Sequence, residues 1–283
     1  MTVKVTLMGA GGKMGCRITD RLREESKYDV DHVEPGKEGR HRLDERGIEP
    51  VPEDEAIADA DAVILAVPDE LIGPITESIV PKADPGTAFM MLDPAAAHAG
   101  VLHEREDVTY FLAHPAHPSF FTAETRLNDD DPDWFGGQGR DPQDVVCSLH
   151  QGPEEHYEKC AELTRAMYAP VRNVHRLTTE QMALLEPALV ETVLATCLEV
   201  IREGCDTVVE KGVPEEAARE FLFGHMRIEL GIIFGYTDFP FSDGAQQAMK
   251  EARDEIFKPD WKEKVFDGEQ VEASTKRIAS SDD

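Results

Sequence analysis

The stretch VKVTLMGAGGKMGCRITDRL, residues 3–22, decides how the first half of the chain folds. An apolar run meets a cluster of glycines, and the residues that follow have the spacing of an amphipathic helix. A glycine-rich turn between a strand and a helix is typical of a phosphate-binding site, because the helix N-terminus offers free backbone N–H groups. The turn therefore predicts a dinucleotide site that includes Gly9, Gly11, Gly12, Lys13 and Met14.

The glycine spacing departs from the G-x-G-x-x-G pattern. Met14 holds the sixth position, and Gly15 comes one place later. The first glycines of such a turn form the bend and admit the pyrophosphate, whereas the last one only eases helix–strand packing. The departure is therefore compatible with a dinucleotide-binding fold.

Short apolar runs recur along the first half of the chain. They lack polar alternation, which indicates strands that are covered on both faces and hence a parallel sheet between helices. The predicted strands are residues 3–8, 29–34, 62–67, 87–92, 109–113, 144–149 and 171–177, and the predicted helices include 13–25 and 154–168. The sequence therefore predicts an α/β fold, a Rossmann doubly wound parallel sheet, over residues 1–176.

Glu34 ends the second predicted strand. An acid at this place binds the adenosine ribose hydroxyls and repels a 2′-phosphate. We therefore predict NAD as the cofactor. Lys37, Arg40 and Arg42 follow closely and leave NADP open as the less favoured alternative.

The later strand ends supply further candidate residues, since ligands of open α/β sheets bind at the carboxyl edge. Val67 and Pro68 are predicted to line the cofactor, and Ala95 lies in a run of small residues that leaves room for a nicotinamide ring. The next strand ends in His-Pro-Ala-His-Pro. His114 and His117 of this motif are predicted to be catalytic, because histidine exchanges protons near neutral pH.

Strand signals disappear after residue 177. Apolar residues at helical spacing predict a long helix that starts at a capping box formed by Thr178 and Gln181. Further helices are expected over 214–234 and 243–256, and the polar tail after Phe266 is expected to fray. We predict a helical substrate and dimerisation domain over residues 177–283.

Acidic side chains fall on the apolar stripe of the long helix. Glu186 shares a face with apolar residues, which is a costly place for a charge unless it is paired or binds a ligand. Glu186 and Glu191 are predicted to be catalytic, while a buried ion pair or a surface helix end remains the alternative. Pro187 kinks the helix or marks a restart.

The composition restricts the function. Aspartate and glutamate number 57 against 29 lysines and arginines, so the net charge is −28. This balance argues against nucleic acid and against an anionic membrane surface as partners. Because concentrated salt screens such self-repulsion, the charge favours a halophile.

The five cysteines show no C-x-x-C spacing, which indicates buried free thiols rather than disulfides or a zinc site. The sequence shows neither a signal peptide nor an uninterrupted apolar stretch of membrane-spanning length. A cytoplasmic protein is therefore expected.

Six motifs together resemble the D-apionate oxidoisomerase family, a branch of the 6-phosphogluconate-dehydrogenase-like and ketol-acid-reductoisomerase-like superfamily. The motifs are LMGAGGKMG, LDPAAAHAG, AHPAHPSFF, CSLHQGPEEHY, TTEQMALLEPALVET and FPFSDGA. The resemblance covers nearly the whole chain, and with the acidic composition it favours a haloarchaeal member. Ala116 departs from the pattern, since a cysteine is expected there in relatives.

The resemblance implies an NAD-dependent oxidoreductase that acts on CH–OH groups of a branched sugar acid such as apionate. It further implies a rearrangement, a divalent metal ion that assists it, and a homodimer formed through the helical domain. The metal or acid–base residues carried over are His114 and Glu191. The small-molecule carboxylate substrate loses a hydroxyl proton to His114, or to water on the metal, while hydride passes to NAD.

Two alternatives remain open. One is a simple 3-hydroxyacid or imine dehydrogenase without rearrangement, although no lysine is placed like the catalytic lysine of the hydroxyisobutyrate type. The other is a dinucleotide-binding protein without catalytic activity.

Overall fold

The computed structural model describes residues 2–122, 130 and 133–280. The chain divides into two compact units, Met1–Glu186 together with Glu272–Asp283, and Pro187–Val271. The first unit extends past residue 176 because helix α7 (Thr179–Ala183) packs within it and buries Met182 and Ala183. That residues 1–176 bind the coenzyme and residues 177–283 bind the substrate and form the dimer stays a prediction.

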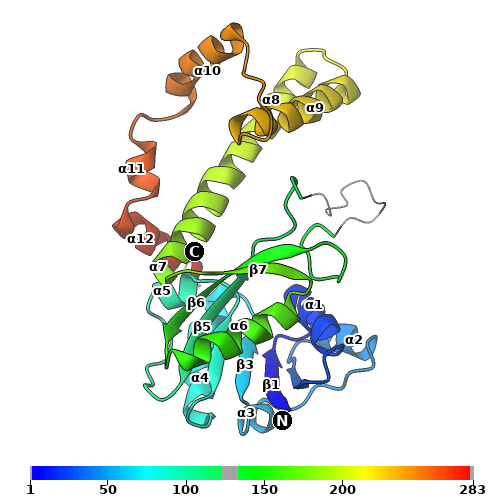
Figure 1. The fold of residues 1–283 in the computed structure, drawn as a ribbon, viewed down its shortest axis with the longest axis vertical. Helices are drawn as coiled ribbons and strands as arrows, with labels where there is room; N and C mark the ends of the chain where they lie inside the picture. The colour runs from blue at the N-terminus through cyan, green and yellow to red at the C-terminus, as the bar shows by residue number, and fades with distance from the viewer. Residues whose placement is uncertain (1, 123–129, 131–132, 281–283) are drawn as a thin grey trace. The chain divides into compact units, whose positions relative to one another are not determined.

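The first unit is built on a seven-stranded sheet in the order β2-β1-β3-β4-β5-β6-β7 (Figure 1). The strands are Val3–Met8 (β1), Tyr28–Val33 (β2), Ala62–Leu65 (β3), Ala88–Met91 (β4), Thr109–Pro115 (β5), Gln143–Gln151 (β6) and Val171–Arg176 (β7). All neighbouring pairs are parallel except β5 and β6, which are antiparallel. The predicted fold class is confirmed, but a sheet that is parallel throughout is wrong for β6 and β7, which run opposite to the other strands.

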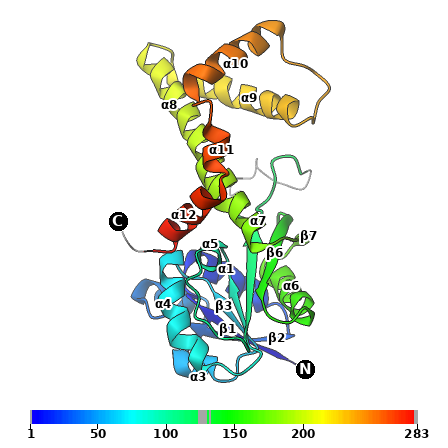
Figure 2. The same ribbon diagram turned by 90° about the vertical axis from the view of Figure 1, so that its left-hand side faces the viewer.

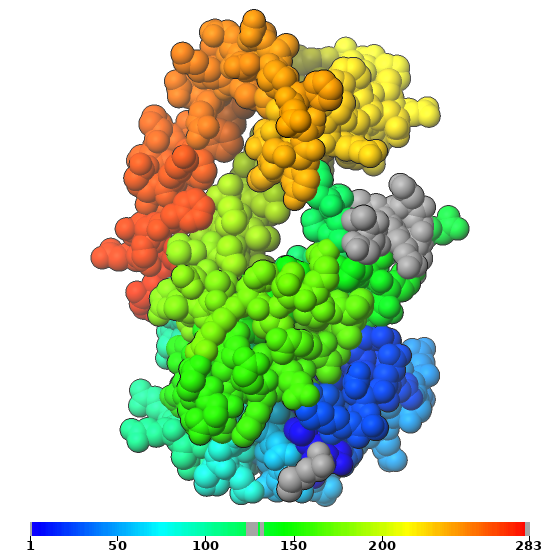
Figure 3. Space-filling model, in the orientation of Figure 1, coloured from blue at the N-terminus to red at the C-terminus, as the bar shows by residue number. Residues whose placement is uncertain are grey.

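Helices cover both faces of this sheet. Their bounds are Lys13–Leu22 (α1), Lys37–Asp44 (α2), Glu53–Ile57 (α3), Asp69–Ile79 (α4), Ala95–His98 (α5) and Glu155–Met167 (α6). In Figure 2, α4 and α6 lie on opposite sides of the strands, and in the space-filling view the side chains of α6 close one face (Figure 3). Two buried apolar clusters result, one under α1 and α6 and one under α3, α4 and α5.

The strand order reverses direction at β1, because β2 lies on one side of it and β3 on the other. In open α/β sheets the ligand crevice opens at the carboxyl ends of the strands next to such a switch point. Here the chain leaves β1 at Gly9 and β3 at Ala66, which places the glycine turn at that crevice.

The second unit is helical. It contains most of a π-helix, Leu184–Ala195, followed by Thr196–Glu210 (α8), Glu215–Ile233 (α9), Asp243–Ile256 (α10) and Trp261–Val265 (α11). Pro187 lies inside the π-helix, and the Thr192 hydroxyl donates to its carbonyl at 2.6 Å. The helix type therefore changes around the proline, where an ordinary α-helix meets a steric clash.

The C-terminal segment forms a helix, α12 (Gly268–Ile278), so the expected frayed tail after Phe266 is wrong. Its end belongs to the first unit, where Thr275 is fully buried and Ala279 joins the cluster under α4. The Thr275 hydroxyl lies 2.9 Å from Nδ1 of His98 in α5. The burial of these small side chains explains why this segment is ordered as a helix although it carries few large apolar side chains.

Candidate active site and coenzyme pocket

A cavity of about 720 Å³ opens at the carboxyl ends of β1, β2 and β3. Gly9, Gly12, Glu34, Val67 and Pro68 line it, so five of the nine predicted coenzyme residues share one wall. Its volume is within the range of small-molecule and cofactor sites. The cavity therefore coincides with the crevice expected from the strand order.

The glycine turn leaves no room for side chains. Gly9 has a φ of +69°, and a Cβ on it would lie 2.4 Å from the Ala66 carbonyl oxygen. A Cβ on Gly15 would lie 2.2 Å from the Gly9 carbonyl oxygen, so this glycine allows α1 to pack close to the turn. The backbone at the start of α1 stays bare, as the approach of a pyrophosphate requires. The turn fits NAD.

Glu34 lies beside the glycine turn at the end of β2. Its carboxylate accepts a hydrogen bond from the Gly11 N–H at 3.0 Å and another from the Gly36 N–H at 2.8 Å. Arg42 donates from Nε to the Gly11 carbonyl at 2.6 Å. Lys37, Arg40 and Arg42 line the same cavity, so an acid and three cations surround the predicted position of the ribose.

Four predicted coenzyme residues do not line this wall: Gly11, whose N–H donates to Glu34, and Lys13, Met14 and Ala95. The exposed Lys13 places Nζ 3.4 Å from the Phe135 ring centroid, and Met14 packs against the apolar cluster under α1. Ala95 is fully buried, and its N–H donates to Oδ1 of Asp93 at 2.7 Å. Their roles in binding the coenzyme stay predictions.

A cluster of three ionisable side chains lies at the same carboxyl edge. Met91 of β4 pairs with Leu112 of β5, so Asp93 and His114, each two residues further along, emerge side by side. Glu186, near the start of the π-helix, is the third member. His114 Nε2 lies 3.9 Å from Asp93 Oδ2 and 3.7 Å from Glu186 Oε2.

Hydrogen bonding fixes the orientation of the His114 ring. Nδ1 lies 2.9 Å from the Pro115 carbonyl oxygen, which only accepts, so Nδ1 carries a proton. In the neutral ring the lone pair is then on Nε2, the atom that faces both carboxylates. This is the arrangement of a metal-binding or proton-accepting histidine.

Burial favours the neutral form of both acids. The three side chains are only 19%, 20% and 23% exposed for His114, Asp93 and Glu186, respectively. Burial raises the pKa of Glu186 to about 7, and the nearby Asp93 charge adds to this shift. Burial also raises the pKa of Asp93, against the opposing effects of the Ala95 N–H and of His114.

The donor set fits a divalent cation. One ligand atom from each of Asp93, His114 and Glu186 lies within 4.8 Å of the other two. Two carboxylates and one imidazole suit divalent metals, and a cation between them would relieve the cost of two buried acids. Sequence reasoning missed Asp93, although its position directly after a buried strand, next to the strand of His114, was a usable signal.

Two further predicted catalytic residues, His117 and Glu191, are not members of this cluster. The His117 ring centroid lies 6.2 Å from that of His114, and its Nδ1 donates to the Phe135 carbonyl at 2.7 Å. Burial lowers the pKa of His117. Glu191 belongs to the second unit. A catalytic role for both, and a metal-binding role for Glu191, stay predictions.

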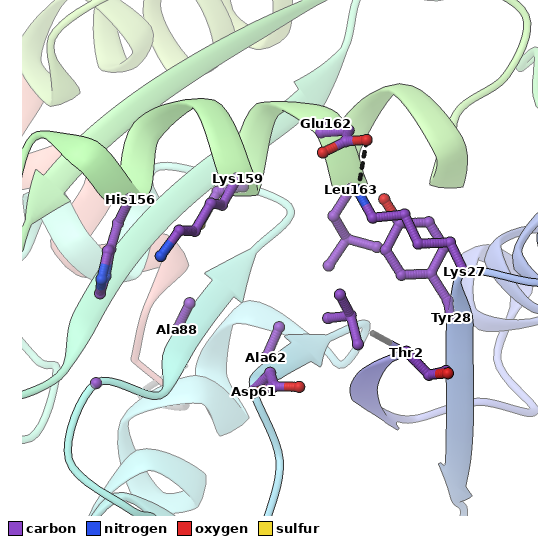
Figure 4. Close-up of a pocket in the computed structure, with 13 residues that line it drawn as sticks. Thr2, Lys27, Tyr28, Asp61, Ala62, Ala88, His156, Lys159, Glu162 and Leu163 are labelled. Atoms are coloured by element: carbon purple, nitrogen blue, oxygen red, sulfur yellow. Dashed lines mark ion pairs between the residues drawn. The ribbon is translucent and has the colours of Figure 1, made fainter.

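Another cavity, of about 380 Å³, lies at the opposite edge of the sheet (Figure 4). Val3, Ala62 and Ala88, which stand at the start of their strands, line it together with α6. Figure 4 shows Lys27 reaching Glu162, and their charged atoms are 2.5 Å apart. This cavity contains none of the predicted site residues.

Comparison with known proteins gives close relatives over the whole chain. The family model for the phosphogluconate dehydrogenase (decarboxylating) C-terminal region matches residues 124–279, more than half of the chain. D-apionate oxidoisomerase from Cupriavidus necator is 46% identical, covering 98% of this chain and 100% of the relative. The enzyme of the same name from Rhizobium rhizogenes is 45% identical, with coverage of 98% and 100%.

Solved structures agree with this relationship. A semialdehyde dehydrogenase NAD-binding protein from Cupriavidus necator, in complex with calcium and NAD, is 45% identical with a TM-score of 0.92, covering 98% of this chain and 100% of that one. An NADH-preferring ketol-acid reductoisomerase from an uncultured archaeon shares the fold, at 20% identity and a TM-score of 0.66, with coverage of 98% and 82%.

A Rossmann-like domain with a glycine turn, followed by a helical region of the phosphogluconate dehydrogenase type, defines an NAD-binding dehydrogenase. Within this class, the chain belongs to the D-apionate oxidoisomerase family. The resemblance inferred from the motifs is confirmed. Among the described residues, no helix combines the length and the apolar character needed to span a bilayer.

Proposed function

We propose that this protein catalyses the NAD-dependent oxidation of D-apionate, coupled to an isomerisation, at the cluster of Asp93, His114 and Glu186. The observation that carries the proposal is this cluster, which lies at the same sheet edge as the coenzyme cavity in a chain 46% identical to a D-apionate oxidoisomerase. When bound, NAD supplies the hydride acceptor and a divalent cation supplies positive charge that polarises the oxidised carbon.

The side chains of the chain account for the proton transfer. The Pro115 carbonyl holds the His114 ring so that Nε2 accepts the proton of the substrate hydroxyl. Before a cation binds, Glu186, with a pKa of about 7, carries a proton in part of the molecules near neutral pH. The Ala95 N–H keeps the Asp93 carboxylate in place beside His114. The carboxylates of Asp93 and Glu186 would hold the cation, which leaves Nε2 of His114 open as the proton acceptor.

The decisive experiment replaces His114. We expect His114→Asn to lower NADH formation from D-apionate at least about 100-fold, a typical loss for a proton-transfer group, while NAD binding measured by calorimetry is retained. His175→Asn is the matched control, because His175 is an exposed histidine on β7 that pairs with Asp144. Full turnover in His114→Asn with NAD bound would disprove the central role of His114.

Product analysis separates oxidation alone from oxidation with rearrangement. We expect product masses and carbon connectivity to reveal a rearranged skeleton, and EDTA to abolish turnover. An unrearranged product formed without metal would instead support a simple dehydrogenase. NAD binding without turnover on any sugar acid would support a dinucleotide-binding protein.

We infer that a second copy of the chain covers the helical unit. Helices α8, α10 and α11 bury no residue, and large apolar side chains on the second unit are exposed, among them Phe221, Phe234, Tyr236 and Phe239. Exposed apolar area on this scale is typical of an interface between subunits. Light scattering is expected to give the mass of a homodimer, and a monomer would contradict this inference.

The use of NAD and the five free cysteines also support a cytoplasmic enzyme, since cysteines in oxidising compartments outside the cytosol usually form disulfides.

A further inference from the structure

A basic groove runs along the outer face of α1. It forms a cavity of about 570 Å³ whose lining includes Lys13, Arg17, Arg21, Arg23 and Arg46. Lys13, Arg17 and Arg21 are spaced four residues apart, so they share one helix face. The chain as a whole carries 57 acids against 29 lysines and arginines, whereas this groove has only two acids in its lining. The local charge therefore opposes that of the molecule.

The two acids in the groove are already paired. Asp20 accepts from Arg46 at 3.0 and 3.1 Å, and Glu24 accepts from Arg21 at 3.0 and 3.1 Å. For Lys13, Arg17 and Arg23, by contrast, no ion pair occurs within the described part of the chain. The first two lie over the Phe135 ring, which does not neutralise their charge. The groove thus keeps three uncompensated cations.

A glycine-rich loop lies against the same arginines. Gly136, Gly137 and Gly139 have φ values of +71°, +80° and +79°, which a side chain would strain. A Cβ on Gly139 would lie 2.4 Å from Nη1 of Arg21, so the loop approaches this guanidinium closely because it carries no side chain there. Nε of Arg21 is buried and has no hydrogen-bond partner. Because this atom is closed off from solvent, the donors that the groove offers to a ligand are those of Lys13, Arg17 and Arg23.

We propose that this groove binds a small phosphorylated molecule that carries at least two negative charges. Guanidinium groups match phosphate oxygens in pairs, and the volume suits a metabolite rather than a single ion. The groove shares no lining residue with the coenzyme cavity, so the ligand is not the coenzyme of the proposed reaction. The inference stands independently of the proposed function.

Inorganic pyrophosphate is the probe, added to the full chain with NAD at saturation and without divalent metal. Saturating NAD occupies the glycine turn, so that pyrophosphate cannot bind there. Isothermal calorimetry is expected to give one site, weakened at least about tenfold in the double variant Arg17→Gln with Arg23→Gln. Arg17→Lys with Arg23→Lys is expected to retain part of the affinity, which separates lost charge from misfolding.

The matched control is Lys159→Gln with Arg165→Gln, which removes two positive charges from α6, outside the groove. We expect its pyrophosphate affinity to equal that of the unmodified protein. An equal loss in this control, unchanged affinity in the Arg17 and Arg23 variant, or no binding once NAD is saturating would overturn the proposal. Citrate binding as tight as that of pyrophosphate would overturn the assignment to a phosphate ligand.

Discussion

The carboxyl group of Glu186 has a pKa of about 7 because it is buried close to Asp93. Below that pH it is protonated, and a divalent cation must displace the proton before it binds. We therefore expect calcium affinity to rise by up to about tenfold per pH unit as the pH approaches 7, and to level off above it.

Calorimetry at several pH values tests this expectation on the bound ion alone, without relying on turnover. Glu186→Gln should weaken binding and flatten the profile. Glu180→Gln is the control, because hydrogen bonds to its carboxylate lower the pKa of Glu180, so this group stays ionised over the whole pH range. A profile that keeps its slope in Glu186→Gln would assign the titration to another group.

Glu34 is expected to select the coenzyme. A carboxylate beside the Gly11 N–H repels a 2′-phosphate, while Lys37, Arg40 and Arg42 in the same cavity would attract it. Glu34→Gln should raise the ratio of NADP to NAD affinity by about tenfold, the effect of 1.4 kcal/mol. Equilibrium titration of each coenzyme measures this ratio.

Glu38→Gln is the matched control for Glu34, because Glu38 lines the same cavity. It removes an equal charge, but from the first turn of α2 and not from the end of β2. An equal shift in both variants would mean that general charge, and not the position of Glu34, sets the preference.

Single residues differed in how well the sequence could predict them. Glu186 was predictable because a carboxylate on an apolar helix face needs a partner, and the structure places it beside His114. Asp93 was missed because one acid among 57 carries little information without the neighbouring strand. The register of β4 and β5, which brings Asp93 beside His114, depends on tertiary pairing.

At the scale of elements, the capping box of α7 allows a direct test of how much a helix cap contributes to stability. The Thr178 hydroxyl accepts from the Gln181 N–H at 3.2 Å, and the Gln181 side chain accepts from the Thr178 N–H at 2.9 Å. Thr178→Ala is expected to lower the free energy of unfolding by about 1 kcal/mol, the usual cost of losing such a cap. Thr178→Ser, which keeps the hydroxyl, should lose much less. Thermal melts of the three proteins measure the difference.

The strands were the elements that the sequence predicted best. Runs such as Ala62–Leu65, apolar and bounded by polar or turn residues, are confirmed as buried strands. The antiparallel direction of β6 could not be predicted, because apolar periodicity is the same in either direction. Helix α12 was missed although Val271, Thr275 and Ala279 recur every four residues, since two of these three are small or polar.

At the scale of the molecule, the net charge of −28 leads to a prediction about salt. Self-repulsion destabilises a compact chain of this charge, and salt screens it within about 3 Å at 1 M. We expect the melting temperature to rise steadily with KCl concentration. Sucrose at equal osmolality is the control, since it does not screen charge. A melting temperature that KCl and sucrose raise equally would contradict an electrostatic cause.

The return of the C-terminal segment to the first unit affects how the protein is made. Thr275 and Ala279 complete the covering of a sheet whose strands were all synthesised before Pro187. During translation the N-terminal sheet therefore emerges from the ribosome first. Helix α12, which packs on it, is synthesised only after the whole of Pro187–Val271. Domains usually fold in order as they emerge. In this chain the first domain is complete only once the segment from Glu272 onward has been synthesised, so a premature stop codon even within α12 should lead to proteolysis of the product.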